Sequence, residues 1–118
     1  MNLVTISNAQ GRVPVTVLQL QDRVNLGNTA ELEQAAREEY AAGGRDMVID
    51  LSKAPSLTSA AIRSILVIYK MLVDPKADKV KHLKLVSPTP YVRGVLEITG
   101  LLEYIEVYDN LDAAVVSF

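Results

Sequence analysis

The sequence lacks cysteine and tryptophan altogether, and it contains only one histidine. Without cysteine the chain has neither disulfides nor thiolate metal ligands. A single histidine leaves too few parts for zinc sites or for catalytic triads. Glycine-rich phosphate-binding motifs are also absent, so we expect no metal and no other cofactor. The absence of cysteine excludes no compartment, but it favours the cytosol, and we expect a cytoplasmic protein.

An excess of positive charge is missing as well. The 12 Lys and Arg residues stand against 14 Asp and Glu residues, and no basic cluster occurs. Nucleic acid is therefore not an expected partner, because binding it requires a concentrated positive surface. The longest apolar run, residues 65–73, is interrupted by Lys70 and falls short of the about 20 residues that span a bilayer. No signal peptide is apparent, and we expect no membrane insertion.

Aliphatic side chains are what the sequence does have. Hydrophobic residues make up 49% of the chain and aromatic residues only 5%. An aliphatic core of this kind suits helices packed on a sheet. A chain of 118 residues can build one such core but not two. We therefore expect one domain over residues 1–118.

The stretch at residues 47–72 organises the rest. Residues 47–51 form a short apolar run that is typical of a strand buried on both faces. Pro55 ends this strand, and apolar residues then recur at helical spacing over residues 60–72. Thr58 and Ser59 lie where strand pattern changes to helix pattern. A hydroxyl is thus predicted at a helix N-terminus beyond the carboxyl end of a buried strand, where α/β proteins usually carry their function.

The remaining pattern alternates strands with helices. We expect strands at 3–7, 13–20, 80–86 and 104–108, and helices at 29–42, at 90–99 and from Asn110 or Asp112 to 115. The first two strands form a hairpin with a turn at 8–11, and an exposed loop covers 74–79. The fold class is therefore α/β, with a central mixed sheet, mostly parallel with one antiparallel strand, and about four helices.

The helical spacing also predicts which side chains face the core. In the helix at 29–42, Glu33 and three other charged residues face water, and Glu33 stands four residues before Arg37, a favourable pair. In the strand at 80–86, His82 and Lys84 lie on the side opposite Leu83 and Leu85. In the helix at 90–99 the buried stripe is Val92, Val95, Leu96 and Thr99.

Three polar residues are candidates for chemistry, and each has a structural alternative. His82 is interpreted as a solvent-facing or half-buried strand residue rather than a catalytic one. Asp50 is either a carboxylate in a site or, the interpretation we favour, a cap for the loop that follows it. Ser59 is either an ordinary helix cap, which residue chemistry alone favours, or a phosphorylation site at the positive end of a helix.

The order of these elements resembles a known family. After Asp50-Leu51-Ser52 a short loop leads to a hydroxyl-rich turn that opens a helix. This resembles the STAS domain of bacterial anti-sigma-factor antagonists, whose motif is roughly aspartate, phosphorylatable serine, serine or threonine, glycine and leucine. The matching positions here are Thr58, Ser59, Ala60, Ala61 and Ile62. Residues 22–32, with Asn25 where an aspartate is usual, and residues 86–101 agree in order as well.

The resemblance implies a protein switch without catalytic residues of its own. The unphosphorylated domain would bind an anti-sigma factor that is also a serine kinase, phosphorylation of Ser59 would break that complex, and a phosphatase would restore it. Thr58 in place of aspartate removes a charge, and Ala61 in place of glycine restricts the backbone. The expected partner contacts are Asn25, Thr58, Ser59, Ala60, Arg63, Ser64 and Val67.

Two questions stay open at the level of the sequence. A second apolar line on the helix at 60–72, namely Ala60, Ser64, Val67 or Ile68, and Met71, is either covered by a neighbouring helix or loop or exposed as a docking surface. The family also contains scaffold subunits of stress-sensing assemblies and transport complexes, which is our alternative function. An enzyme comes third, and a homodimer is one form the chain can take.

Overall fold

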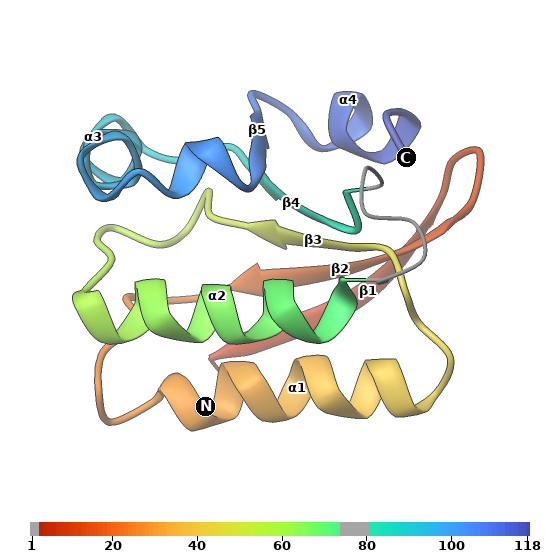
Figure 1. The fold of residues 1–118 in the computed structure, drawn as a ribbon, viewed down its shortest axis with the longest axis horizontal. Coiled ribbons are helices and arrows are strands. Elements are labelled where there is room, and N and C mark those ends of the chain that lie inside the picture. The colour runs from red at the N-terminus through yellow and green to blue at the C-terminus, as the bar shows by residue number, and fades with distance from the viewer. Residues whose placement is uncertain (1–2, 74–80) are drawn as a thin grey trace.

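The computed structural model describes residues 3–73 and 81–118, which form one five-stranded sheet with helices on both faces (Figure 1). The strands lie in chain order across the sheet; β1 and β2 are antiparallel, and the other neighbours are parallel. The predicted α/β class and element order are confirmed. The elements are β1 Val4–Gln10, β2 Pro14–Leu20, α1 Thr29–Ala41, β3 Met47–Asp50, α2 Ser59–Leu72, β4 Leu83–Val86, α3 Pro90–Thr99, the 3-10 turn η1 Leu101–Glu103, β5 Glu106–Tyr108 and α4 Leu111–Val116.

The N-terminal hairpin is longer than its sequence suggests. The predicted turn at residues 8–11 is wrong, because β1 continues to Gln10, which pairs with Pro14. The chain reverses instead at residues 11–13. Gly11 lies tightly against α4, and a Cβ at this position would meet the backbone oxygen of Val115 at 2.7 Å. Cross-strand pairing and this close approach place the turn, and neither is visible in the local pattern.

The two faces of the sheet are packed very differently. One face is covered by α1, α2 and α3 (Figure 1) and holds the main core, which includes the fully buried Leu18, Ile49 and Ile65. The other face is covered by α4 over a small valine cluster. All four residues of β3 are buried. This confirms the prediction that the central apolar run is a strand with both faces covered.

A buried lysine lies on the side of the sheet that α4 covers. Lys84 is only 4% exposed, and its ammonium donates to Ser117 Oγ at 2.7 Å and pairs with Glu106 Oε1 at 3.2 Å. A buried charge needs such partners to offset its lost hydration. The predicted separation of Lys84 from Leu83 and Leu85 is thus confirmed, while His82 lies just before β4 and is half-buried.

Two predicted surface assignments and one predicted strand boundary are wrong. Glu33 does not face water; it is half-buried between α1 and α2 and accepts a hydrogen bond from Ser64 Oγ at 2.7 Å. Thr99 is exposed rather than buried, and its hydroxyl donates to the Leu96 carbonyl of the preceding turn at 3.1 Å. The last strand begins at Glu106, since η1 precedes it. The predicted pair between Glu33 and Arg37 is present at 3.4 Å.

Two predictions fall partly or wholly on residues that the structure does not describe. They are the loop at 74–79 and Val80, the first residue of the predicted strand at 80–86. Within residues 3–73 and 81–118, no helix combines the length and the apolar character needed to cross a bilayer.

Candidate functional site

The turn that opens α2 is held by Thr58 rather than Ser59. The Thr58 hydroxyl accepts a hydrogen bond from the Ala61 amide at 3.2 Å and donates one to the Val24 carbonyl at 2.9 Å. It therefore caps the helix and ties it to the loop that precedes α1, where Val24 also bridges to Leu57. The cap predicted for this turn is present, but Thr58 supplies it.

Ser59 is left with an exposed side chain at the first position of α2. Among the described residues no hydrogen bond to its hydroxyl is found. The amides of a first helical turn have no partner within the helix, and they carry the positive end of the helix dipole. Ser59 is therefore a reachable alcohol beside groups that would stabilise an added anion.

Asparagine side chains brace the neighbouring loop at residues 22–28. Asn25 Oδ1 accepts from the Gly27 amide at 2.8 Å, and Asn28 Oδ1 accepts from the Asn25 amide at 2.7 Å. Asn28 also donates to the Arg23 carbonyl at 3.0 Å. These bonds use the amide side chains to shape the loop. Asn25 is exposed, so its contact with a partner would come from a pre-ordered turn.

Asp50 also has a structural role. One of its oxygens accepts from the Ser52 amide at 2.9 Å, and the other accepts from Gln19 Nε2 at 3.1 Å. The residue is only 8% exposed. The favoured interpretation of Asp50 as a loop cap is confirmed, and the carboxylate is turned toward its own chain rather than toward a ligand.

The second apolar line of α2 is buried at its first two positions and partly exposed further along. Ala60 and Ser64 are buried, at 8% and 2% exposure, and Ser64 bonds α1 through Glu33. Of the two alternatives for this line, burial is the one observed at Ala60 and Ser64, so neither side chain is exposed for docking, whereas the line becomes exposed at Val67. Arg63 and Val67 stay exposed on the free side of α2, where Val67 is 41% accessible.

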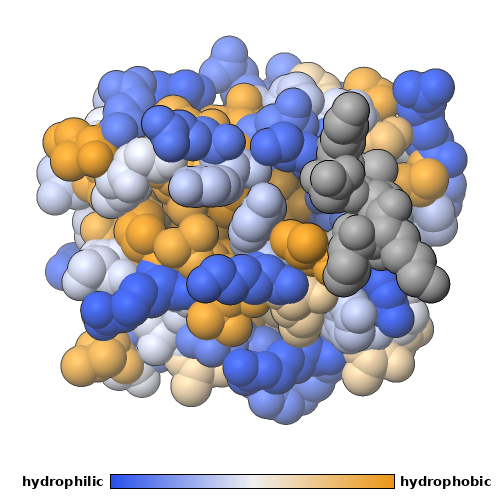
Figure 2. All heavy atoms as spheres, in the orientation of Figure 1, coloured by the Kyte–Doolittle hydropathy of each residue, from blue (hydrophilic) through white to orange (hydrophobic). Residues whose placement is uncertain are grey.

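Apolar surface gathers instead between α2 and the α3 end of the molecule (Figure 2). Half-buried side chains that pack on the core there include Ile62, Leu66, Val95 and Leu102. Leu26 adds a further apolar group, 79% exposed at the tip of the braced loop. The sequence reasoning missed Leu26, although an isolated leucine between Asn25 and Gly27 in a polar loop is a detectable signal.

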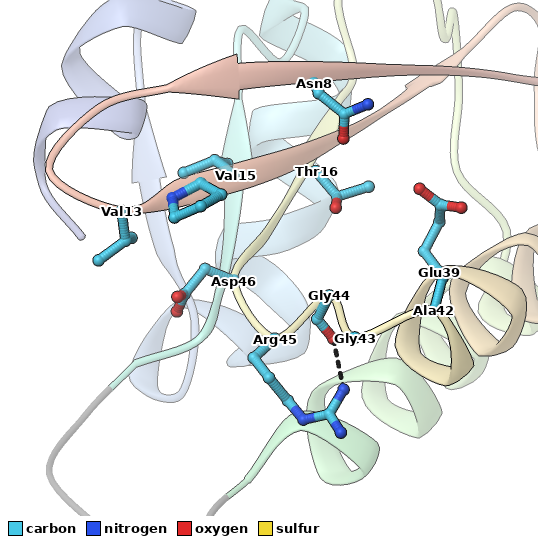
Figure 3. Close-up of a pocket in the computed structure, with 11 residues that line it drawn as sticks. Asn8, Val13, Val15, Thr16, Glu39, Ala42, Gly43, Gly44, Arg45 and Asp46 are labelled. Atoms are coloured by element: carbon cyan, nitrogen blue, oxygen red, sulfur yellow. Dashed lines mark hydrogen bonds between the residues drawn. The ribbon is translucent and has the colours of Figure 1, made fainter.

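A hollow lies at the opposite end of the sheet. It measures about 600 Å³ and is lined by the start of β2 and the segment between α1 and β3 (Figure 3). Arg45 does not reach into it, because its guanidinium donates to the carbonyls of Tyr40 and Gly44 and stacks 3.7 Å from the Tyr40 ring centre. Asp46 is bonded to His82 Nδ1 at 2.7 Å. The polar groups named here therefore already have partners.

These positions divide the predicted site residues into two groups. Asn25, Thr58, Ser59, Arg63 and Val67 lie on the exposed surface around the start of α2, whereas Ala60 and Ser64 lie beneath it. In the described part of the chain, no cluster of three or more His, Cys, Asp or Glu side chains has the geometry of a metal site. The arrangement is suited to binding and to modification of a hydroxyl by another protein.

Comparisons with known proteins agree with this geometry. A family model for the STAS domain matches residues 7–114. BtrV of Bordetella bronchiseptica, named as a candidate anti-sigma factor antagonist, is 32% identical over 99 residues that cover 84% of this chain and 82% of that protein.

Two solved structures share the fold. An anti-sigma factor antagonist from Mycobacterium paratuberculosis has a TM-score of 0.81 at 24% identity, with 97% of this chain and 91% of that chain covered. The unphosphorylated form of the anti-sigma factor antagonist SpoIIAA has a TM-score of 0.71 at 13% identity, with 94% and 93% covered. These two structures show the shared fold, whereas the family model and the 32% identical relative show the family. The chain belongs to the STAS domain family of anti-sigma factor antagonists.

Proposed function

We propose that this protein is a regulatory switch that binds an anti-sigma factor and loses that partner when Ser59 is phosphorylated. The anti-sigma factor is itself the serine kinase: it transfers the γ-phosphoryl group of ATP to Ser59 Oγ, and ADP and a proton leave. A phosphatase removes the phosphate and restores binding. The chain acts by binding and not by catalysis, in the bacterial cytoplasm where sigma factors work.

The observation that carries this proposal is that, of two adjacent hydroxyls, one is hydrogen-bonded within the chain and the other is exposed. Thr58 bonds both the helix and the neighbouring loop, so it is held in place. Ser59, one residue later, is exposed and needed by neither contact. Phosphorylation of Ser59 therefore leaves the cap intact while it places about two negative charges on the surface.

The surroundings of Ser59 fit a protein partner. Exposed Leu26, Arg63 and Val67 and the apolar surface between α2 and α3 offer the mixture of apolar and cationic groups common in protein interfaces. A phosphate in such an interface would have to be desolvated against the partner, which is costly unless the partner supplies a cation. The charge thus opposes binding without any change of fold.

Phosphorylation with a matched control tests the proposal. We expect anti-sigma kinases from the encoding organism to add one phosphate in the presence of ATP, with mass mapping to Ser59. A Ser59→Ala variant should take up none, and a Thr58→Val variant should still be modified. Absence of phosphate on Ser59 with every such kinase, together with stable recovery in a large complex, would instead favour the alternative of a scaffold subunit.

A further inference from the structure

The outer edge of β1 presents a row of unpaired backbone groups. The Gln21 amide donates to the Leu3 carbonyl at 2.7 Å, and the Gly11 amide donates to the Val13 carbonyl at 3.2 Å. Antiparallel pairs alternate between bonded and non-bonded positions, so odd-numbered residues of β1 bond to β2. The even-numbered residues therefore point their N–H and C=O groups away from the sheet. The Val4 amide among them already donates to Glu31, so within the described part of the chain the unpaired amides of this edge are those of Ile6, Asn8 and Gln10.

This edge has few of the usual protections against strand addition. The strand runs for seven residues without proline and without a charged side chain. Residues 5–8 are all exposed. Proteins commonly protect such an edge with charges, proline or bulges, because an unpaired edge templates another strand. On β1 itself none of these is present.

A shallow groove runs beside the same edge, between β1 and α1, which lies along that flank of the sheet (Figure 1). It measures about 290 Å³, and Ile6, at 40% exposure, is the apolar side chain at its centre. The other lining residues are Val4, Glu31, Gln34, Ala35 and Glu38. A strand added to β1 would therefore lay every second side chain into this groove.

The charge of the groove identifies its occupant. The two acidic residues of the groove are Glu31, which accepts from the Leu3 and Val4 amides, and Glu38, which accepts from Gln34 Nε2 at 3.1 Å. A second copy paired through β1 about a two-fold axis would place α1 beside its own mate, with like charges facing each other. A partner strand with Lys or Arg side chains meets the acidic wall with opposite charge instead.

We propose that β1 and α1 bind an extended, basic segment of a partner protein as a sixth strand. A β-branched residue of that segment lies opposite Ile6, and cationic residues two positions to either side reach Glu31 and Glu38. The main-chain bonds supply affinity, and the charges set the sequence preference. This site is separate from the surface around Ser59 and does not depend on phosphorylation.

The test uses the whole chain and a defined probe. The probe is a capped heptapeptide in which Lys, Val and Lys alternate with Thr. Its binding is measured by the changes in the amide chemical shifts of the protein in NMR spectra. We expect shifts in residues 4–10 and along α1, with the Ser59 amide unchanged. N-methylation of the central valine, which removes the amide that would face the Ile6 carbonyl, should weaken binding about tenfold.

Charge variants complete the test. Glu38→Lys should weaken binding about two- to fivefold, whereas Glu103→Lys, the same charge change on an exposed residue of η1, should not. The proposal is overturned if no peptide binds, if the N-methylated peptide binds as well as the parent, or if the shifts lie around α2. Sedimentation that shows a dimer disrupted by Ile6→Lys would assign the edge to a second copy and overturn it as well.

Discussion

The two ends of the central sheet differ in what their polar groups are doing. At the amino ends of β2 and β3 a hollow is lined in part by Arg45 and Asp46, both already bonded within the chain. At the carboxyl ends Ser59 and Arg63 are exposed beside apolar groups. The charged groups named at the two ends thus differ in whether they are engaged within the chain or exposed to a partner. For a domain that binds another protein, exposed groups are the better guide, because the partner forms its interface with groups that are still accessible.

The largest effect should come from a charge at position 59. If the proposed switch holds, Ser59→Asp weakens binding of the anti-sigma factor about tenfold or more, because an unpaired carboxylate must be desolvated in the interface. Ser59→Asn, which has the same shape without the charge, retains most of the affinity. Titration calorimetry measures both variants, and equal affinities for Asp and Asn would contradict an electrostatic switch.

The next largest effect should be on stability, at the adjacent residue. Thr58→Val keeps the shape of the side chain but removes the bonds to Ala61 and Val24. We expect the free energy of unfolding to fall by about 1 to 2 kcal/mol in urea denaturation. Ser59→Ala should change it by less than about 0.5 kcal/mol. Similar losses for the two variants would mean that Ser59 shares the cap.

The opposite end of the sheet should affect stability but not partner binding. Asp46→Ala removes the 2.7 Å bond to His82 and should cost about 1 kcal/mol of unfolding free energy. Affinity for the anti-sigma factor should remain at the level of the unsubstituted chain. Loss of affinity in a variant that is still folded by circular dichroism would place part of the partner surface at the hollow.

The smallest effect is expected at Arg45. Arg45→Ala removes a guanidinium stacked on Tyr40 and its bonds to two carbonyls, all at the surface. The expected loss of unfolding free energy is about 0.5 to 1 kcal/mol. Arg45→Lys, which keeps the charge but not the planar stacking, should recover only part of it. A larger change in partner affinity than in stability would show that the hollow is used for binding.

The fold could be predicted from local patterns because each central element carries a clear one. The apolar run of β3 and the helical spacing of α2 specify their elements without reference to the rest of the chain. The exposed position of Ser59 follows from the change of period between them. Errors arose where a neighbour in space decided the outcome, as at the end of β1, where Pro14 pairs with Gln10.

Partners distant in sequence account for the site errors as well. Thr58 and Ser59 are equally plausible caps in the sequence, and the Val24 carbonyl, 34 residues away, is an additional partner that only Thr58 bonds. In the sequence, nothing marks Ser64 as buried. In the structure it is buried and donates a hydrogen bond to Glu33, which lies 31 residues away. Neither contact can be predicted from a repeating sequence pattern, because each joins a single side chain to an element that it meets only in the folded chain.

The sequence alone determined the order of elements, the buried central strand and the hydroxyl turn at the start of α2, because backbone propensity and hydrophobic period act over a few residues. Tertiary structure decided which hydroxyl is engaged, which face of α2 is covered and which edge of the sheet stays unpaired. Those properties depend on how separate segments approach one another, and packing in three dimensions sets that approach.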